Sequence, residues 1–189
     1  MSITIDVKGL QEGLVKIDAL SGETKRATSK AINTAIPKIR NAIVDKTTQD
    51  YFISKANVKK TIDVKRANPS GLSAFIRSKG RPVALTKFRV TPKRPPKRPP
   101  KRKGRTVKAQ VMRNGRGGTI PNAFIACMGS GHIGAMYRKG ADRYPIGQFH
   151  GPAVPSMLKN AEVSAFVGNV AQEELLRQLG TSFEELVRK

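Results

Sequence analysis

The spacing of hydrophobic residues in the first part of the chain predicts a strand followed by helices. Apolar and polar residues alternate within residues 3–7, which is the period of a short half-buried strand. The apolar residues between 10 and 17 recur every third or fourth position and predict a short helix. A longer helix follows, with isoleucines on one face and alanines beside them: Ile32, Ile36, Ile39 and Ile43, and Ala27, Ala31, Ala35 and Ala42. Pro37 lies inside this pattern and predicts a kink near residues 33–37, because proline cannot donate to the helical ladder.

Alternation and turn-forming residues predict antiparallel strands through the middle of the chain. Ser54 is first placed to cap a short basic helix. The predicted strands span residues 61–66, 72–77, 82–90, 106–112, 122–128 and 132–138. The turn formers NPSG, SKG, RNGRGG and GSG separate strands that follow one another directly. The middle of the chain is therefore predicted to form a sheet built by hairpins.

The last part of the chain predicts a long helix. Pro155 can occupy a first-turn position, and apolar residues then follow with helical spacing: Val163, Val167, Val170, Ala171, Leu175 and Leu179. Gly180 is expected to end this helix, and Ser182 with Glu185 resembles a capping box for one last short helix. The order of strand, helices, strands and helix is typical of an α+β fold.

The length of 189 residues fits a single domain over residues 1–189. Within it we expect a mostly antiparallel, hairpin-built sheet packed with a long helix in the N-terminal half and a long C-terminal helix. The expected parts are 1–90 with a strand, helices and strands, 91–108 with an extended basic proline-rich loop, 109–153 with hairpins, and 154–189 with the C-terminal helices.

A basic proline-rich tract, TPKRPPKRPPKRKGR, occupies residues 91–105 between two predicted strands. It holds five prolines and eight Lys or Arg residues and no acid, and the unit KRPP occurs at 93–96 and again at 97–100. Paired prolines favour polyproline II, so at about 3.1 Å per residue the tract extends roughly 45 Å, or half that distance as a returning arm. The candidate contacts with a polyanion are Lys93, Arg94, Lys97, Arg98, Lys101, Arg102, Lys103, Arg105 and Lys108. A solvated linker without a partner fits the same composition.

The charge of the chain is strongly positive and unevenly distributed. The formal net charge is +23, which favours polyanions such as nucleic acid or an acidic protein surface. From Val154 onward there are four bases and five acids, so this segment carries −1 and the first 153 residues carry +24. The two parts are expected to face different neighbours.

Catalytic, metal and membrane motifs have little support. His132 and His150 lie on segments without a matching cluster of cysteines or carboxylates, so neither a metal nor another cofactor is expected. NGRGGT at 114–119 lacks the Lys-Ser/Thr pair of a phosphate loop. Cys127, the single cysteine, is interpreted as a buried structural thiol on an apolar strand. No apolar run reaches about 18 residues, so membrane insertion is not expected, and we expect a protein that is not an enzyme.

A longer pattern between residues 121 and 155 resembles the minor tail protein Z family of long-tailed bacteriophages, the tail-completion proteins. Members share a pattern like P-x-A-F-I, a G-H turn, a basic residue, R-x-P-I and G-P-x-V-P before a C-terminal helix. The matching positions are Pro121, Ala123, Phe124, Ile125, Gly131, His132, Arg138, Arg143, Pro145, Ile146, Gly151, Pro152, Val154 and Pro155. The N-terminal half is similar as well, with an alanine-rich helix containing KAINTAI and a polybasic central loop. Pro37 and the KRPP repeat depart from the family pattern.

The resemblance implies a structural protein of the virion that acts late in assembly. Expected partners are further copies of itself in a ring, with six copies expected from the family, and tail terminator, tail tube or head-tail connector proteins. The expected place is the neck region of the tail, with the host cytoplasm as the site of assembly. The basic arm suits genomic double-stranded DNA in the tail lumen or an acidic face of another tail protein.

A cellular nucleic-acid-binding protein of ribosomal type is the alternative, because high positive charge and an extended basic loop suit that role too. Readers of single strands usually offer aromatic platforms, however, and this chain is 5% aromatic with no tryptophan. The low aromatic content therefore counts against a reader of single strands.

Overall fold

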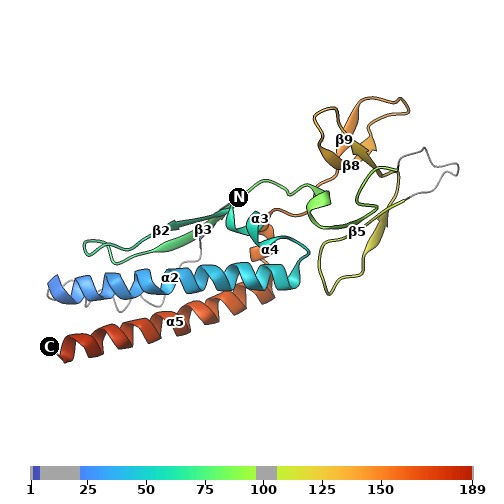
Figure 1. Cartoon of the computed structure of the whole chain (residues 1–189). Helices are drawn as coiled ribbons and strands as arrows, with labels where there is room; N and C mark the ends of the chain where they lie inside the picture. The colour runs from blue at the N-terminus through green and yellow to red at the C-terminus, as the bar shows by residue number, and fades with distance from the viewer. Residues whose placement is uncertain (1, 5–21, 97–105, 189) are drawn as a thin grey trace.

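Two long antiparallel helices pack side by side in this molecule. The computed structural model describes residues 2–4, 22–96 and 106–188, so the helix predicted between 10 and 17 lies outside the described residues. Helix α2 (Gly22–Asp50) and helix α5 (Ala161–Val187) run side by side along most of the length of the molecule. The start of α2 therefore lies beside the end of α5 at one tip (Figure 1).

Helix α2 buries the predicted face of isoleucines. Ile32, Ile36, Ile39 and Ile43 are each 6% exposed or less, and they pack with apolar residues of α5 and of the strands. The helix continues through Pro37, whose side chain is exposed, so the proline does not end it. No measured bend angle tests the predicted kink, which stays a prediction.

The C-terminal helices differ from the prediction in two ways. Pro155 lies in the first turn of a separate short helix, α4 (Val154–Leu158), and Asn160 caps the start of α5 by accepting a hydrogen bond from the Glu162 amide at 3.0 Å. Helix α5 then continues through Gly180 to Val187, so the predicted stop and the predicted last helix are both wrong. Packing explains the continuation, because the helix still lies beside α2 there: Lys30 and Glu185 approach within 4.0 Å.

The strands form three antiparallel sheets of three strands each in the described residues. The first has the order β1–β3–β2, with β1 (Ser2–Thr4), β2 (Ile62–Lys65) and β3 (Phe75–Lys79), and lies along α2. The second contains β4 (Arg89–Thr91), β5 (Val107–Gln110) and β6 (Gly118–Ile120). The third contains β7 (Phe124–Cys127), β8 (Ile133–Arg138) and β9 (Ile146–Gln148). These sheets and the two long helices confirm the predicted α+β class.

The predicted strand over residues 82–90 is wrong in its first part. Leu85–Lys87 form a 3-10 turn, η3, and only Arg89–Thr91 form strand β4. Before the turn, the chain pairs with the segment after β9: the Leu85 amide donates to the Phe149 carbonyl at 3.1 Å. The turn redirects the chain from this pairing to the pairing with β5. The strand β9 was not predicted.

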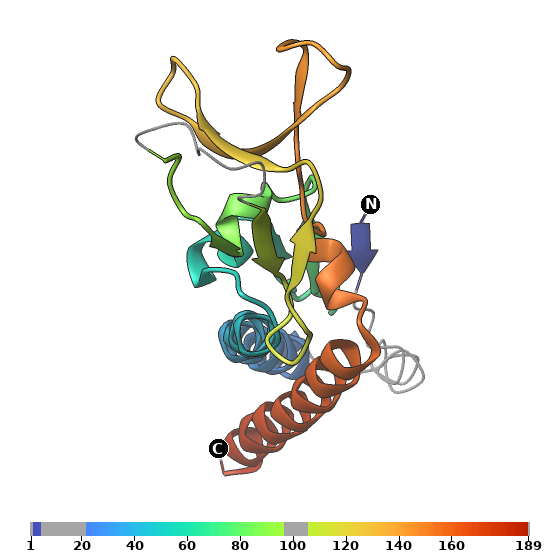
Figure 2. The ribbon, with the colours of Figure 1, turned by 90° about the vertical axis from the view of Figure 1, so that its right-hand side faces the viewer.

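The second and third sheets occupy a different region of the molecule from the two long helices and the first sheet. In Figure 2 the second and third sheets lie above α2 and α5. The short helix α3 (Lys55–Lys59), capped by Ser54 as predicted, follows α2 where the chain passes from one region to the other. In the part of the chain that the structure describes, no helix is both long enough and apolar enough to cross a bilayer.

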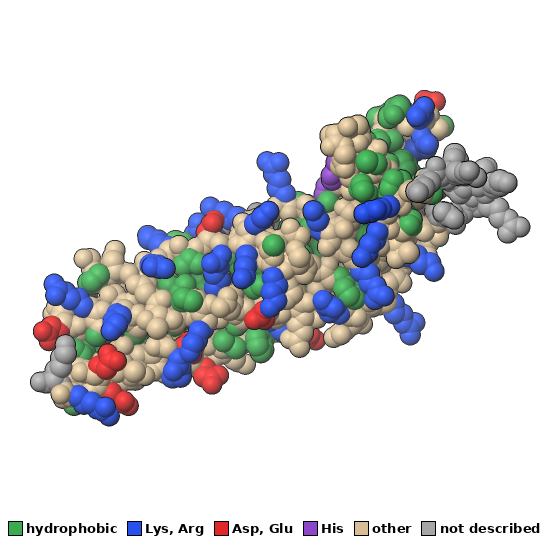
Figure 3. All heavy atoms as spheres, in the orientation of Figure 1, with side chains coloured by type: hydrophobic (Ala, Val, Ile, Leu, Met, Phe, Trp, Pro, Cys, Tyr) green, Lys and Arg blue, Asp and Glu red, His purple; other side chains and the backbone are tan. Residues whose placement is uncertain are grey.

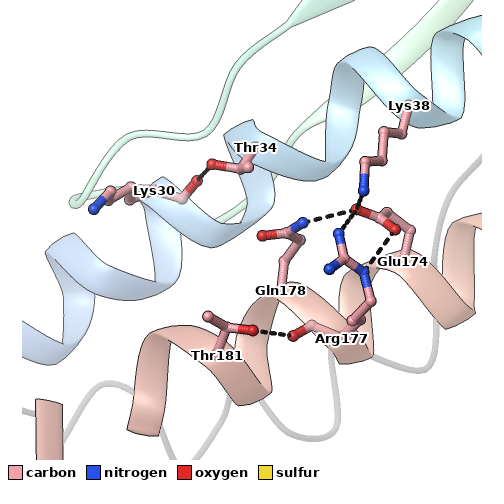
Figure 4. Close-up of polar contacts among 7 residues, drawn as sticks. All are labelled: Lys30, Thr34, Lys38, Glu174, Arg177, Gln178 and Thr181. Atoms are coloured by element: carbon pink, nitrogen blue, oxygen red, sulfur yellow. Dashed lines mark hydrogen bonds and ion pairs between the residues drawn. The ribbon is translucent and has the colours of Figure 1, made fainter. Parts of the chain in front are cut away.

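A polar cluster joins the two long helices on their exposed side. Glu174 of α5 accepts hydrogen bonds from Arg177 at 2.7 and 3.1 Å and from Gln178 at 2.8 Å, and it pairs with Lys38 of α2 at 3.2 Å (Figure 4). The Arg177 guanidinium, helped by Gln178 and Lys38, lowers the pKa of Glu174 from 4.5 to about 2. Glu174 thus ties α5 to α2 as an anion.

This cluster predicts a pH-dependent contribution to stability. Because the pKa of Glu174 in the folded chain, about 2, lies below its ordinary value of 4.5, the carboxylate stabilises the fold above pH 4.5. The contribution is lost as the pH falls toward 2. We expect Glu174→Gln to lower the free energy of unfolding at neutral pH by about 1 kcal/mol, since the partners are solvent-exposed.

Denaturant unfolding of both proteins at neutral pH and at about pH 3 measures this effect. The difference between wild type and Glu174→Gln is expected to shrink at the lower pH. Asp142→Asn, a change of an exposed loop acid, serves as the control. A difference that stays constant on acidification would contradict the assigned role of the carboxylate.

Candidate polyanion-binding surface

The basic tract leaves the body from one antiparallel ladder. Strands β4 and β5 pair Arg89 with Gln110, Val90 with Ala109 and Thr91 with Lys108, as the predicted hairpin requires. Thr91 and Lys108, which bound the segment that contains the tract, are therefore neighbours in the sheet. In β5, Val107 is buried, Lys108 is exposed, and the two residues that follow are half-buried.

The candidate cations fall into two groups. Lys93 and Arg94, which follow β4, and Lys108 on β5 are exposed. The remaining candidates lie outside the described residues: Lys97, Arg98, Lys101, Arg102, Lys103 and Arg105. The described cations thus lie on both sides of the hairpin: Lys93 and Arg94 follow β4, and Lys108 lies on β5.

An aromatic residue anchors this hairpin to the end of α2. The guanidinium of Arg89 lies 5.3 Å from the centre of the Phe52 ring, and that of Arg113 lies 4.5 Å from it. The Phe52 amide donates to the Val111 carbonyl at 2.8 Å, and Arg113 Nε donates to the Thr48 carbonyl at 3.0 Å. Sequence reasoning missed this anchor, since the partners are far apart in the chain and follow no shared motif.

A cleft next to the hairpin combines residues of the tract and of the recognised pattern. It has a volume of about 610 Å³, and its lining includes Lys87, Phe88, Lys93, Gly131 and His132. The lining holds two lysines and no acid. His132 Nε2 lies 3.3 Å from Gln148 Oε1, so a side chain of β9 positions the imidazole. The cleft can accept an anionic group next to an apolar wall.

The fourteen residues of the recognised pattern are distributed between core and surface. Buried members are Ala123, Ile125, Val154 and Pro155. Half-buried members are Phe124, Ile146, Gly151 and Pro152. Exposed members are Pro121, Gly131, His132, Arg138, Arg143 and Pro145. The pattern therefore does not outline one common site.

Arg138 organises the loop between β8 and β9. Its Nη1 donates to the backbone carbonyls of Arg143 at 2.8 Å and of Asp142 at 3.4 Å. Its guanidinium also lies 5.4 Å from the centre of the Phe124 ring. Arg138 thereby fixes the chain that returns to β9.

Gly151 belongs to the packing around the cleft. A Cβ at this position would lie 2.5 Å from Phe88 Cε2, and Phe88 is 6% exposed. The Gly151 amide donates to the Val83 carbonyl at 2.8 Å. The residue therefore lets two segments approach closely beside Phe88, which lines the cleft.

Basic and acidic side chains are distributed unevenly over the molecule. Lys and Arg side chains are spread widely over the face shown in Figure 3, including the strand-rich end. Helix α5 differs, because it holds five glutamates against Arg177 alone, with Arg188 following as its C-cap. This agrees with the charge division expected from the sequence.

Two further expectations concern metals and cysteine chemistry. Within the described ranges, no three or more His, Cys, Asp or Glu side chains are grouped so that they could hold a metal ion. Cys127 is exposed on β7, so the prediction of a buried thiol is wrong. Ile125, two positions earlier on the same strand, is buried instead.

Comparisons with known proteins give one match. The family model described as "Prophage minor tail protein Z (GPZ)" matches residues 7–189. No curated protein and no solved structure matches significantly. The match includes the helices, the strands β2 to β9 and the basic tract, and β1 precedes it.

Proposed function

The chain belongs to the prophage minor tail protein Z family, and from this membership we propose that it completes the phage tail at the end that joins the head. Membership makes it a structural protein of the phage tail. The observation that carries the proposal is the family match over residues 7–189. In this role the chain acts in the neck region of the virion, after assembly in the host cytoplasm.

The basic tract supplies the polyanion contact in this proposal. Its cations bind the phosphates of double-stranded DNA in the tail lumen through charge, without reading the base sequence. The exposed Lys93, Arg94 and Lys108 at the two ends of the tract support this role. An acidic face of a neighbouring tail protein offers the same chemistry, and binding assays with each kind of partner distinguish the two.

The body of the protein makes the protein contacts. We propose that several copies form a ring, six from the family resemblance, and that the ring docks to a tail terminator, tail tube or head-tail connector protein. A ring requires a head-to-tail contact between two different surfaces of the subunit. Membership in a tail family favours this role over a cellular nucleic-acid-binding protein of ribosomal type.

Cryo-electron microscopy of the neck of purified particles tests the proposed function. Density for this chain is expected as a ring at the head-proximal end of the tail, with residues 91–105 directed toward the DNA. Particles made without the chain are the control and should lack this density. Particles that contain the chain only elsewhere in the tail would contradict the proposed place.

A further inference from the structure

Helix α5 carries an apolar stripe that the described part of the chain leaves largely exposed. Leu176, Phe183 and Val187 are 63%, 40% and 87% exposed. Together with Gly180 they form what we call the outer stripe, with intervals of four, three and four residues. This is the spacing of a coiled-coil seam. The buried residues of α5 follow a different face of the helix, because the neighbours Leu175 and Leu176 lie about 100° apart around its axis.

Exposed charges accompany the outer stripe in the order Glu173, Arg177, Glu184, Arg188: Glu173 continues the stripe three residues before Leu176, and the other three lie along one side of it. In a second, antiparallel copy of this helix the order is reversed. Glu173 then meets the partner's Arg188, and Arg177 meets the partner's Glu184. A parallel copy would bring like charges together instead. Arg177 donates to Glu174 through Nε and Nη2. Its Nη1 makes neither of these bonds and can donate to the partner's Glu184.

The same antiparallel register fits the apolar residues to one another. It puts Gly180 opposite the partner's Phe183, and Leu176 opposite the partner's Val187. A Cβ at Gly180 would meet nothing within 4 Å, so an aromatic ring has room there. The register also gives a reason for glycine inside a helix, where it costs about 1 kcal/mol relative to alanine.

We propose that two copies of this chain pair through the outer stripe of α5 as an antiparallel, two-fold symmetric dimer. Such a contact uses the same surface of both copies and closes at two. The pairing concerns the free chain and goes beyond the proposed function, because a ring in the tail needs a separate head-to-tail surface. Failure of the pairing would therefore leave the role in the tail intact.

Light scattering during gel filtration tests the pairing on the full-length chain, after nuclease treatment and a salt wash remove nucleic acid. The wild type is expected to have the mass of a dimer that dissociates on dilution. Phe183→Glu should raise the dissociation constant on the order of a hundredfold, because two-fold symmetry places the substituted residue in the interface twice. Its circular dichroism should stay unchanged. A wild type that is monomeric at every concentration, or a Phe183→Glu chain that dimerises like the wild type, overturns the proposal.

Charge exchange tests the register with exposed residues only, so folding is not at stake. Glu173→Arg faces the partner's Arg188 and should weaken the dimer about tenfold. The double variant Glu173→Arg/Arg188→Glu restores opposite charges and should return the dissociation constant close to that of the wild type. Equal weakening in the single and double variants overturns the antiparallel register.

Discussion

A chain in which six of the eight tract cations are neutralised is expected to bind double-stranded DNA on the order of a thousandfold more weakly than the wild type, because each Lys or Arg releases counterions from the phosphates it contacts. The variant replaces Lys93, Arg94, Lys97, Arg98, Lys101 and Arg102 with glutamine. The slope of log affinity against log salt is expected to fall by about 5. Fluorescence anisotropy of a labelled duplex across several salt concentrations measures both quantities.

A control variant separates the tract from the total charge. It neutralises six exposed cations elsewhere on the body: Lys59, Lys60, Arg66, Lys79, Arg81 and Lys139. Both variants have the same net charge, yet the control should retain most of the affinity. Equal losses in the two variants would show that the overall field, and not the tract, binds DNA. Tight binding of an acidic polypeptide with weak binding of DNA would favour a protein partner for the tract.

An alanine at position 151 is expected to lower the free energy of unfolding by about 1–3 kcal/mol, as overpacking of a filled site does. The new Cβ would lie 2.5 Å from Phe88 Cε2 and 3.1 Å from Cδ2 and Cζ. Phe88 has little room to move, since it is 6% exposed. The backbone of Gly151 has no positive φ, so the opposition comes from packing, and the three atoms nearest the new Cβ all belong to Phe88.

The partner substitution provides the test of this contact. Phe88→Ala alone is expected to cost about 3–5 kcal/mol, because it leaves a cavity in the core. In the double variant the methyl group of alanine 151 enters the vacated space, so the total loss should be smaller than the sum of the two single losses. Gly140→Ala, with open space around the new Cβ, is the control and should change stability by about 0.5 kcal/mol or less. Additive losses in denaturant unfolding would mean that the two residues do not interact.

The parts of the fold that follow from local patterns were predicted from the sequence. The isoleucine face of α2 and the cap at Ser54 are each indicated by residues that lie close together in the sequence, and both are observed. The β4–β5 hairpin is similar, because alternation on each side of the basic tract determines which strands can pair.

The errors arise where distant contacts override local preference. Gly180 favours a helix end, yet α5 continues because α2 still packs beside it. The strand β9 spans Ile146–Gln148 with Gly147 at its centre, which is too short for a visible alternation. There the ring of Tyr137 covers the glycine, so tertiary packing explains what the pattern does not.

The candidate surface was predictable only in part for the same reason. The basic tract is visible in composition alone, and its two ends lie where the hairpin requires. The anchor of Arg89 and Arg113 on Phe52 depends on three segments that meet only after folding. No spacing in the sequence indicates it.

The ladder that joins Thr91 to Lys108 also has a consequence for changes in the length of the basic tract. Because the segment that contains the tract is bounded by one pair of residues, gain or loss of a four-residue KRPP unit changes its length without shifting any pairing in the sheet. Loop length itself costs little, about 0.6 kcal/mol per doubling. The reach of the tract can therefore be adjusted in steps of one repeat, like a spacer of variable length, while the anchored body stays the same.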